Sequence, residues 1–199
     1  MRSPLPVSAR VRWAWLQGLP LRRRRLRRIL RMLEGRTPHS GTLVDVGGGT
    51  GEGTDAAVRT APPGAYRTQI VLDPQSGMLL RGTRARNDRI RIGWVRGSGS
   101  RLPFPNGSVD VVLSLGVLCC MRPTDVPAAV AELGRVLRTD GYCVLGVPRG
   151  WADYCEPLFR GAGFRQVDAL RPGRAVFQRA TDTSNSGTGE SATSSRGSA

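Results

Sequence analysis

The chain has 199 residues, of which 39% are hydrophobic, and this fits one α/β domain with a single core. Its formal net charge is +15 and all 30 basic residues are arginine, which indicates either an anionic partner or a biased coding composition. Four cysteines without a C-x-x-C pair and a single histidine, His39, favour neither a zinc site nor a disulfide framework, so we expect no metal and a reducing, cytoplasmic setting.

Residues 1–40 form a basic arm, in which Arg22 to Arg25 run consecutively and the first acidic residue is Glu34. Apolar residues recur at helical spacing within it, namely Leu26, Ile29, Leu30 and Leu33. Residues 21–34 therefore predict an amphipathic helix with a cationic face. Two interpretations stay open: the helix packs on the domain with solvated arginines, or it contacts an anionic membrane surface or nucleic acid.

The stretch Leu43 to Thr54, L-V-D-V-G-G-G-T-G-E-G-T, predicts a buried strand, a glycine turn and a helix over residues 51–60. The alternating glycines of the turn are Gly47, Gly49 and Gly51. They let a ligand approach the backbone beside the free N–H groups of a helix start, which favours a nucleotide-type cofactor over a turn without a ligand. Glu52 replaces the third glycine of a dinucleotide fingerprint, and the carboxylate of Asp45 suits an ammonium better than a pyrophosphate.

Residues 68–72 predict the second strand, which ends in Asp73. An acidic side chain there is placed to accept the two ribose hydroxyls of an adenosine ligand. It equally suits the N-cap of a helix over residues 74–84. The two roles are compatible, and Asp73 supports an adenosine ligand without choosing its class.

The remaining elements follow in order along the chain. We expect strands at 89–95, 109–114 and 142–147, a helix at 125–137 that ends at Thr139-Asp140-Gly141, a last helix at 151–163, and an antiparallel hairpin of residues 164–170 and 174–180. Residues 181–199 are Ser, Thr and Gly with almost no apolar side chains, which is typical of a disordered tail. The domain is therefore expected to span residues 41–180.

The motif D-V-G-G-G-T-G, starting at Asp45, resembles the first motif of the S-adenosylmethionine-dependent methyltransferases with a Rossmann-like fold. The segments L-P-F-P-N-G-S-V-D-V-V from Leu102 and E-L-G-R-V-L-R-T-D-G from Glu132 are similar to those of the ubiquinone/menaquinone-type (type 11) methyltransferases. The resemblance covers residues 41–180. It implies a class I methyltransferase fold, α/β, with a mostly parallel sheet of seven strands in the order 3-2-1-4-5-7-6 and helices on both faces.

The resemblance also implies the cofactor, S-adenosyl-L-methionine, and its site. Asp45, Gly47, Gly49 and Gly51 are expected around the methionine half and Asp73 on the ribose. The further positions expected in the site are Thr50, Pro74, Ser98, Gly99 and Ser114. Ser98 stands where relatives carry an aspartate that holds the adenine amino group, and a neutral serine is the weaker acceptor.

The chemistry implied is direct attack of an acceptor on the methyl carbon, in which positioning and desolvation carry much of the rate and no protein nucleophile is needed. Cys120, Tyr154 and Asp153 are candidates by location for a general base. We expect a small-molecule acceptor, quinone-like or a hydroxylated metabolite. An RNA methyltransferase that uses the basic arm and a non-catalytic binding protein of the same fold are the alternatives. We further expect residues 21–34 to cover the cofactor cleft.

Overall fold

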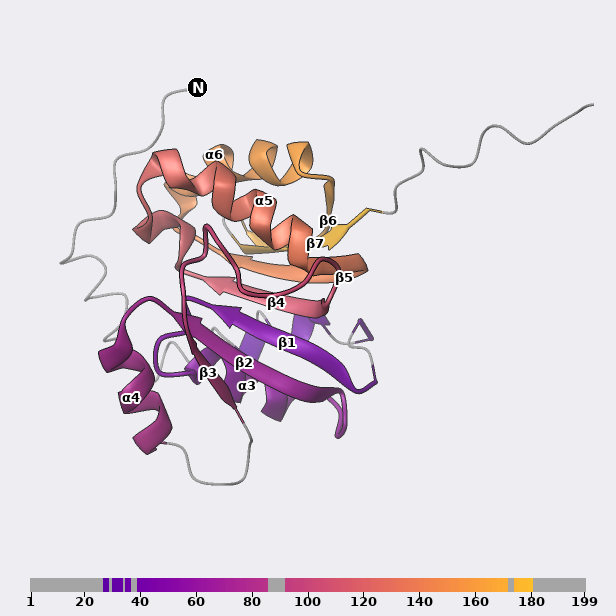
Figure 1. Ribbon diagram of the computed structural model, residues 1–199. Helices are drawn as coiled ribbons and strands as arrows, with labels where there is room; N and C mark the ends of the chain where they lie inside the picture. Colours follow the sequence, from indigo (N-terminus) through magenta and orange to yellow (C-terminus); the bar gives the residue numbers. More distant parts are fainter. Residues whose placement is uncertain are drawn as a thin grey trace, which may run out of the picture.

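The computed structural model describes residues 27, 28, 30–33, 35, 36, 39–85, 92–171 and 174–180. Within this part of the chain, a seven-stranded sheet has the order β3-β2-β1-β4-β5-β7-β6 (Figure 1). The strands are β1 (Gly41–Val46), β2 (Tyr66–Asp73), β3 (Gly93–Arg96), β4 (Val109–Leu115), β5 (Leu137–Gly146), β6 (Phe164–Arg171) and β7 (Arg174–Arg179). Strands β1 to β5 pair in parallel, and β7 pairs antiparallel with both β5 and β6. The predicted fold class and strand order are confirmed.

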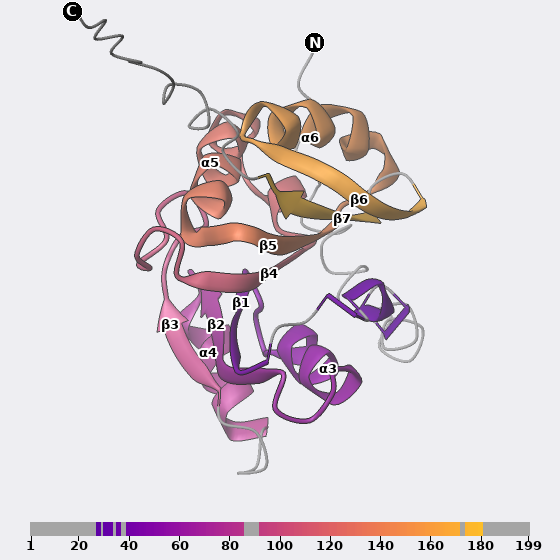
Figure 2. The same ribbon diagram turned by 90° about the vertical axis from the view of Figure 1, so that its right-hand side faces the viewer.

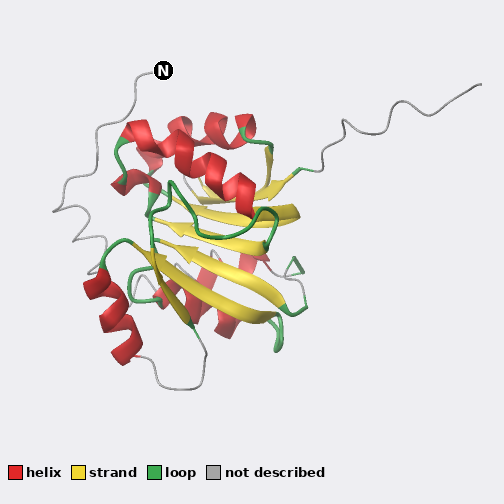
Figure 3. Cartoon of the chain, viewed as in Figure 1, coloured by secondary structure: helices red, strands yellow, loops and turns green. Residues whose placement is uncertain are grey.

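Helices cover both faces of the sheet. They are α3 (Glu52–Thr60), α4 (Ser76–Ala85), α5 (Val126–Val136) and α6 (Arg149–Gly161), with short 3-10 turns η1 (Arg31–Leu33), η2 (Leu118–Cys120) and η3 (Pro123–Asp125). Figure 2 shows α5 and α3 on opposite sides of the sheet, with the indigo segment that contains η1 on the side of α3. Figure 3 shows the same cover as red helices around the yellow strands. This two-sided cover is why the central strands are nearly continuous apolar runs.

Alternate side chains of β1 and β4 enter two cores. The core under α5 and α6 contains Val44, Val46 and Val112. The core under α3 contains Leu43, Val111 and Leu113. Successive side chains of a strand point to opposite faces of the sheet. Asp45 lies between Val44 and Val46, so its side chain points to the opposite face from theirs, which is the face that α3 covers.

Strand β5 begins earlier than expected. The helix before it ends at Val136, and the predicted helix-ending turn at Thr139-Asp140-Gly141 is instead part of the strand. Leu137 already has extended backbone angles and pairs with Val109 of β4, so pairing starts directly after the helix. Asp140 keeps one sign of the expected turn, a positive φ of 63°. Of the predicted strand 89–95, residues 89–91 lie outside the described residues.

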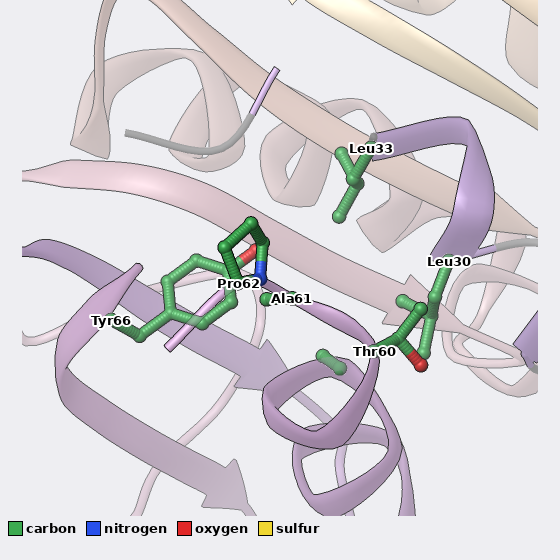
Figure 4. Close-up of a pocket in the computed structure, with 7 residues that line it drawn as sticks. Leu30, Leu33, Thr60, Ala61, Pro62 and Tyr66 are labelled. Carbon is green, nitrogen blue, oxygen red and sulfur yellow. The ribbon is translucent and has the colours of Figure 1, made fainter. Parts of the chain in front are cut away.

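The described part of the N-terminal arm does not lie where we expected it. Leu30 and Leu33 are buried and line a small pocket at the end of α3, shown in Figure 4 with Thr60, Ala61, Pro62 and Tyr66. Tyr66 begins β2 and pairs with Gly41 at the start of β1, so the pocket lies at the amino ends of the strands. The expectation that this stretch covers the cofactor cleft is therefore wrong for Leu30–Leu33.

The rest of the predicted arm, with Arg22 to Arg25 and Ile29, lies outside the described residues, as does the predicted tail 181–199. Arg27 and Arg28 are helical and exposed, and they are followed by the 3-10 turn η1. Among the helices that the structure describes, none combines the length and apolar character required to span a bilayer.

Candidate cofactor site at the carboxyl ends of the strands

The glycine turn between β1 and α3 folds over the end of β2. The backbone N–H groups of Gly47 and Gly48 both donate to the carbonyl of Leu72, at 2.6 and 3.2 Å. The arrowheads of β1 and β4 in Figure 1 mark this edge, on the left of the view. The turn is thus placed at the carboxyl ends of neighbouring parallel strands, where open α/β sheets bind their ligands.

Two of the three alternating glycines are required by packing as well as by any ligand. Gly47 and Gly51 have φ values of 67° and 74°, which disfavour any other residue. A Cβ at Gly47 would lie 2.5 Å from Cγ2 of Val117, and one at Gly51 would lie 2.9 Å from the ring of Trp94. A Cβ at Gly49 would meet the mobile end of Met78 at 3.1 Å and Oδ2 of Asp73 at 4.0 Å. Gly49 is therefore the glycine that faces the predicted ribose contact.

Asp45 lies beneath the turn. Its side chain is buried, and its Oδ2 accepts hydrogen bonds from the backbone N–H and the Oγ1 of Thr54, at 3.0 and 3.1 Å. A Cβ on Gly53 would lie 2.5 Å from the same oxygen. The carboxylate therefore ties the end of β1 to the first turn of α3, where a negative charge is favourable. Sequence reasoning missed this role, and the contact with the methionine ammonium stays a prediction.

Asp73 joins the turn to the next helix. It is buried, its Oδ2 accepts from the N–H of Gly49 at 3.1 Å, and its Oδ1 accepts from the N–H of Gln75 at 2.8 Å. The second bond ends at Gln75, the residue before α4, which begins at Ser76 and not at Pro74 as expected. Asp73 therefore supports the turn that leads into α4 and is not its N-cap, which corrects the expectation. A carboxylate offers about four lone-pair sites, so these two bonds leave acceptor capacity for ribose hydroxyls. The ribose contact stays a prediction, while Pro74 and Thr50 flank the same edge.

The loop after β3 brings Ser98 and Gly99 to this edge. Gly97 donates from its N–H to the carbonyl of Asp73 at 3.2 Å, and a Cβ on Gly99 would lie 3.2 Å from Cγ1 of Val46 at the end of β1. The exposed Ser98 hydroxyl lies 2.9 Å from that of Ser100. Ser98, which the sequence spacing suggested as a site residue, thus lies near Asp73. Its hydroxyl, however, already has a hydrogen-bond partner within the turn, the hydroxyl of Ser100.

Ser114 of β4 carries a buried hydroxyl. The residue is 0% exposed, and among the described residues its Oγ has no hydrogen-bond partner. An unsatisfied buried hydroxyl costs about 1–3 kcal/mol, which a bound polar group or water at this edge would offset. Together with the glycine turn and Asp73, this atom fits a polar ligand at this edge.

The three candidates for a general base differ in their surroundings. The Tyr154 hydroxyl on α6 donates to the carbonyl of Pro123 at 2.9 Å, so it tethers η3. Asp153 and Cys120 are exposed, on α6 and at the end of η2. The neighbouring Cys119 is buried, and its hydrogen bond with Cys120, together with burial, raises the pKa of the Cys119 thiol. Cys119 is therefore neutral, and the candidates remain predictions.

The sheet order, the glycine turn and the acidic residue at the end of β2 together define a class I methyltransferase domain, which is an S-adenosylmethionine-binding fold. A family model described as a methyltransferase domain, Methyltransf_11, matches residues 44–145, about half of the chain, and the chain belongs to that family of S-adenosylmethionine-dependent methyltransferases. The resemblance suggested by the sequence motifs is thereby confirmed.

Two curated relatives share 38% identity with the chain. One is an uncharacterized chloroplastic methyltransferase of Arabidopsis thaliana, matched over 111 residues, 52% of this chain and 30% of the relative. The other is a ubiquinone/menaquinone biosynthesis C-methyltransferase of Methylobacterium nodulans, matched over 103 residues, 50% of this chain and 38% of the relative. The matched part thus spans about a third of the length of these relatives.

A solved structure with a similar fold is the N-methyltransferase NodS from Bradyrhizobium japonicum, in complex with S-adenosyl-L-homocysteine. The superposition of the two chains has a TM-score of 0.66 at 16% sequence identity and covers 82% of this chain and 90% of NodS. At that identity the likeness shows the fold alone.

Proposed function

We propose that this protein transfers a methyl group from S-adenosylmethionine to a small-molecule acceptor, quinone-like or a hydroxylated metabolite. The observation that carries the proposal is the junction of Gly49 with Asp73, which places the glycine turn against the acidic end of β2. The 38% identity with a C-methyltransferase of quinone biosynthesis supports the acceptor class.

Each part of the cofactor has proposed partners along the edge. Asp73 would accept the ribose hydroxyls, and the loop with Ser98 and Gly99 would hold the adenine. Asp45, the glycine turn and the Ser114 hydroxyl would surround the methionine half. When bound, the cofactor supplies an activated methyl group on a sulfonium, so the acceptor takes it by direct SN2 displacement.

The acceptor would lie against the segment that follows β4. This segment contains η2 and η3, and α6 holds it through the bond from Tyr154 to the carbonyl of Pro123. Trp151 lies edge-on to Tyr154 with ring centroids 5.8 Å apart, so the tether is backed by a buried aromatic side chain. We propose that these residues orient the acceptor and exclude water, and that no general base is required.

An anionic partner is proposed for the arginine-rich arm. Arg27 and Arg28 are exposed and follow the run Arg22 to Arg25 after one residue, Leu26, and this run lies outside the described residues. A cluster of arginines next to a domain suits an anionic membrane surface, where quinone-like acceptors partition, or a nucleic acid.

The test is a transfer assay with S-adenosylmethionine labelled in its methyl group. The full chain is incubated separately with hydroquinones, with hydroxylated aromatic metabolites and with total RNA, and a reaction without an acceptor is the control. We expect label in the organic extract of one of the first two. Label confined to RNA would support the RNA methyltransferase instead, and binding of cofactor without transfer to any acceptor would support the non-catalytic alternative.

A further inference from the structure

The loop that follows β3 has an anchor at each end. At its start, the N–H of Gly97 bonds to the carbonyl of Asp73 at the end of β2. At its far end, the segment Leu102–Gly107 is bonded to α5. Between the anchors lies a tight turn, in which the N–H of Arg101 donates to the carbonyl of Ser98 at 3.2 Å. The position of Ser98 and its neighbour therefore depends on both anchors.

The anchor on α5 is the guanidinium of Arg135. Its Nη1 donates to the carbonyl of Phe104 and to Oδ1 of Asn106, both at 2.8 Å. Its Nη2 donates to the carbonyl of Leu102, also at 2.8 Å. A guanidinium presents its donors in a rigid, planar fork. Three bonds from this fork therefore fix the position and the orientation of the segment Leu102–Gly107 relative to α5.

Glu132, one helical turn earlier on α5, holds the guanidinium and the loop together. Its Oε1 accepts from Nε of Arg135 at 2.6 Å, and its Oε2 accepts from Nη2 of Arg135 at 2.9 Å and from the N–H of Leu102 at 2.6 Å. The hydrogen bonds from Arg135 lower the pKa of the Glu132 carboxyl, which keeps it ionised at neutral pH. The carbonyl of Arg135 in turn accepts from the N–H of Gly107 at 3.0 Å.

We infer that Glu132 and Arg135 are a positioning pair for the cofactor, which holds the loop after β3 so that Ser98 and Gly99 stand at the adenine end of the site. The inference rests on the proposed function, in which Ser98 and Gly99 contact the adenine of the cofactor. An isolated surface ion pair contributes little. This pair differs because its side chains bond three backbone groups of a single loop, namely the carbonyls of Leu102 and Phe104 and the N–H of Leu102.

Arg135→Gln removes the guanidinium fork and is compared with Arg160→Gln on α6. Arg160 pairs with Glu156 of its own helix at 2.9 Å and is largely exposed, so it is a matched control. S-adenosylhomocysteine is titrated by calorimetry into each dialysed full-length chain, at a temperature where circular dichroism shows it folded. We expect Arg135→Gln to raise the Kd by about tenfold or more and Arg160→Gln to change it by less than about twofold.

A second pair of variants tests the carboxylate. Glu132→Gln keeps an oxygen that accepts from the N–H of Leu102, whereas Glu132→Ala keeps none. The Kd is therefore expected to rise less in Glu132→Gln than in Glu132→Ala. Equal Kd values for the parent and both variants would overturn the inference.

Hydrogen exchange separates positioning from a general loss of stability. In Arg135→Gln, peptides that cover residues 97–107 are expected to exchange faster, while peptides that cover β1 and the glycine turn keep the parent's rate. A folded Arg135→Gln variant with an unchanged Kd overturns the inference, as does exchange that accelerates evenly along the chain. Either result leaves the proposed function standing. A parent protein that shows no binding of S-adenosylhomocysteine overturns the proposed function and the inference together.

Discussion

Ser114→Ala tests the buried hydroxyl at the carboxyl end of β4. Among the described residues its Oγ has no partner, and the residue is 0% exposed. A buried polar group left unsatisfied costs about 1–3 kcal/mol. Removing it from the cofactor-free protein is therefore expected to raise the free energy of unfolding by about 1 kcal/mol, which for a chain of this size raises Tm by about 2–4 °C.

The same substitution is expected to weaken cofactor binding, because we propose that this hydroxyl bonds the bound cofactor directly or through a water. A neutral hydrogen bond contributes about 0.5–1.5 kcal/mol, so the Kd for S-adenosylhomocysteine should rise about 2- to 10-fold. The assays are thermal unfolding of the dialysed protein by circular dichroism and calorimetric titration. A substitution that raises the free energy of unfolding and also raises the Kd would show that the hydroxyl destabilises the free protein and contributes to ligand binding.

Thr54→Val is the matched control. Thr54 is also 0% exposed, but its Oγ1 donates to Asp45 at 3.1 Å, so this variant is expected to lose about 1 kcal/mol of stability. A fall in Tm of about 2 °C or more for Ser114→Ala would refute the reasoning, since it would show that the hydroxyl has a partner in the free protein. A higher Tm with an unchanged Kd would remove Ser114 from the cofactor site.

Four further predictions concern charged and polar side chains. Asp73→Ala should weaken S-adenosylmethionine binding by about 1.5–3 kcal/mol in calorimetry, and an unchanged affinity would leave Asp73 only its structural bonds to Gly49 and Gln75. Ser98→Asp should tighten binding by about 1 kcal/mol, because a charged acceptor replaces a neutral one, and weaker binding by a folded variant would place the adenine elsewhere. Glu132 has a lowered pKa from its bonds with Arg135, so its contribution to stability is present above the ordinary glutamate pKa and is lost as pH falls through the lowered value. The unfolding free energies of the parent and Glu132→Gln should therefore differ at neutral pH and converge in acid, and a constant difference would contradict this. Replacing Arg22 to Arg25 with glutamine should reduce binding to anionic liposomes in a salt-dependent way, and equal binding at every salt concentration would make the arginines compositional.

The fold could be predicted because its signals are local. The apolar run at Leu43 to Val46, followed by glycines, predicts a buried strand and a turn within a few residues. The order of such motifs along the chain indicates the order of the strands in the sheet. Boundaries were less certain where local and distant preferences compete. Leu137 fits an amphipathic helix by its spacing, but pairing with Val109 of β4 makes it the first residue of a strand.

The site was predicted in outline, and its internal contacts were not. The spacing led to Asp73 and Ser98, which the structure brings to one edge. No sequence pattern showed that Trp94 and Val117 require glycine at two positions of the turn, since these contacts join elements far apart in the chain. The segment around Arg135 did carry a signal, its resemblance to a family motif, but its bonds to the loop after β3 depend on the packing of α5.

For Leu30 and Leu33, the sequence predicted burial but not the place in the fold where they are buried. Their helical spacing correctly indicated an apolar surface that needs cover, and both are buried. Periodicity does not say which surface receives them, and they pack at the end of α3 instead of over the cofactor cleft.

Calorimetry of the dialysed full-length chain tests the central claim most directly. The account predicts binding of both S-adenosylmethionine and S-adenosylhomocysteine with a Kd of about 1 μM or tighter, and weaker binding of NAD. No heat with either S-adenosylmethionine or S-adenosylhomocysteine, together with a clear isotherm for NAD, would contradict it.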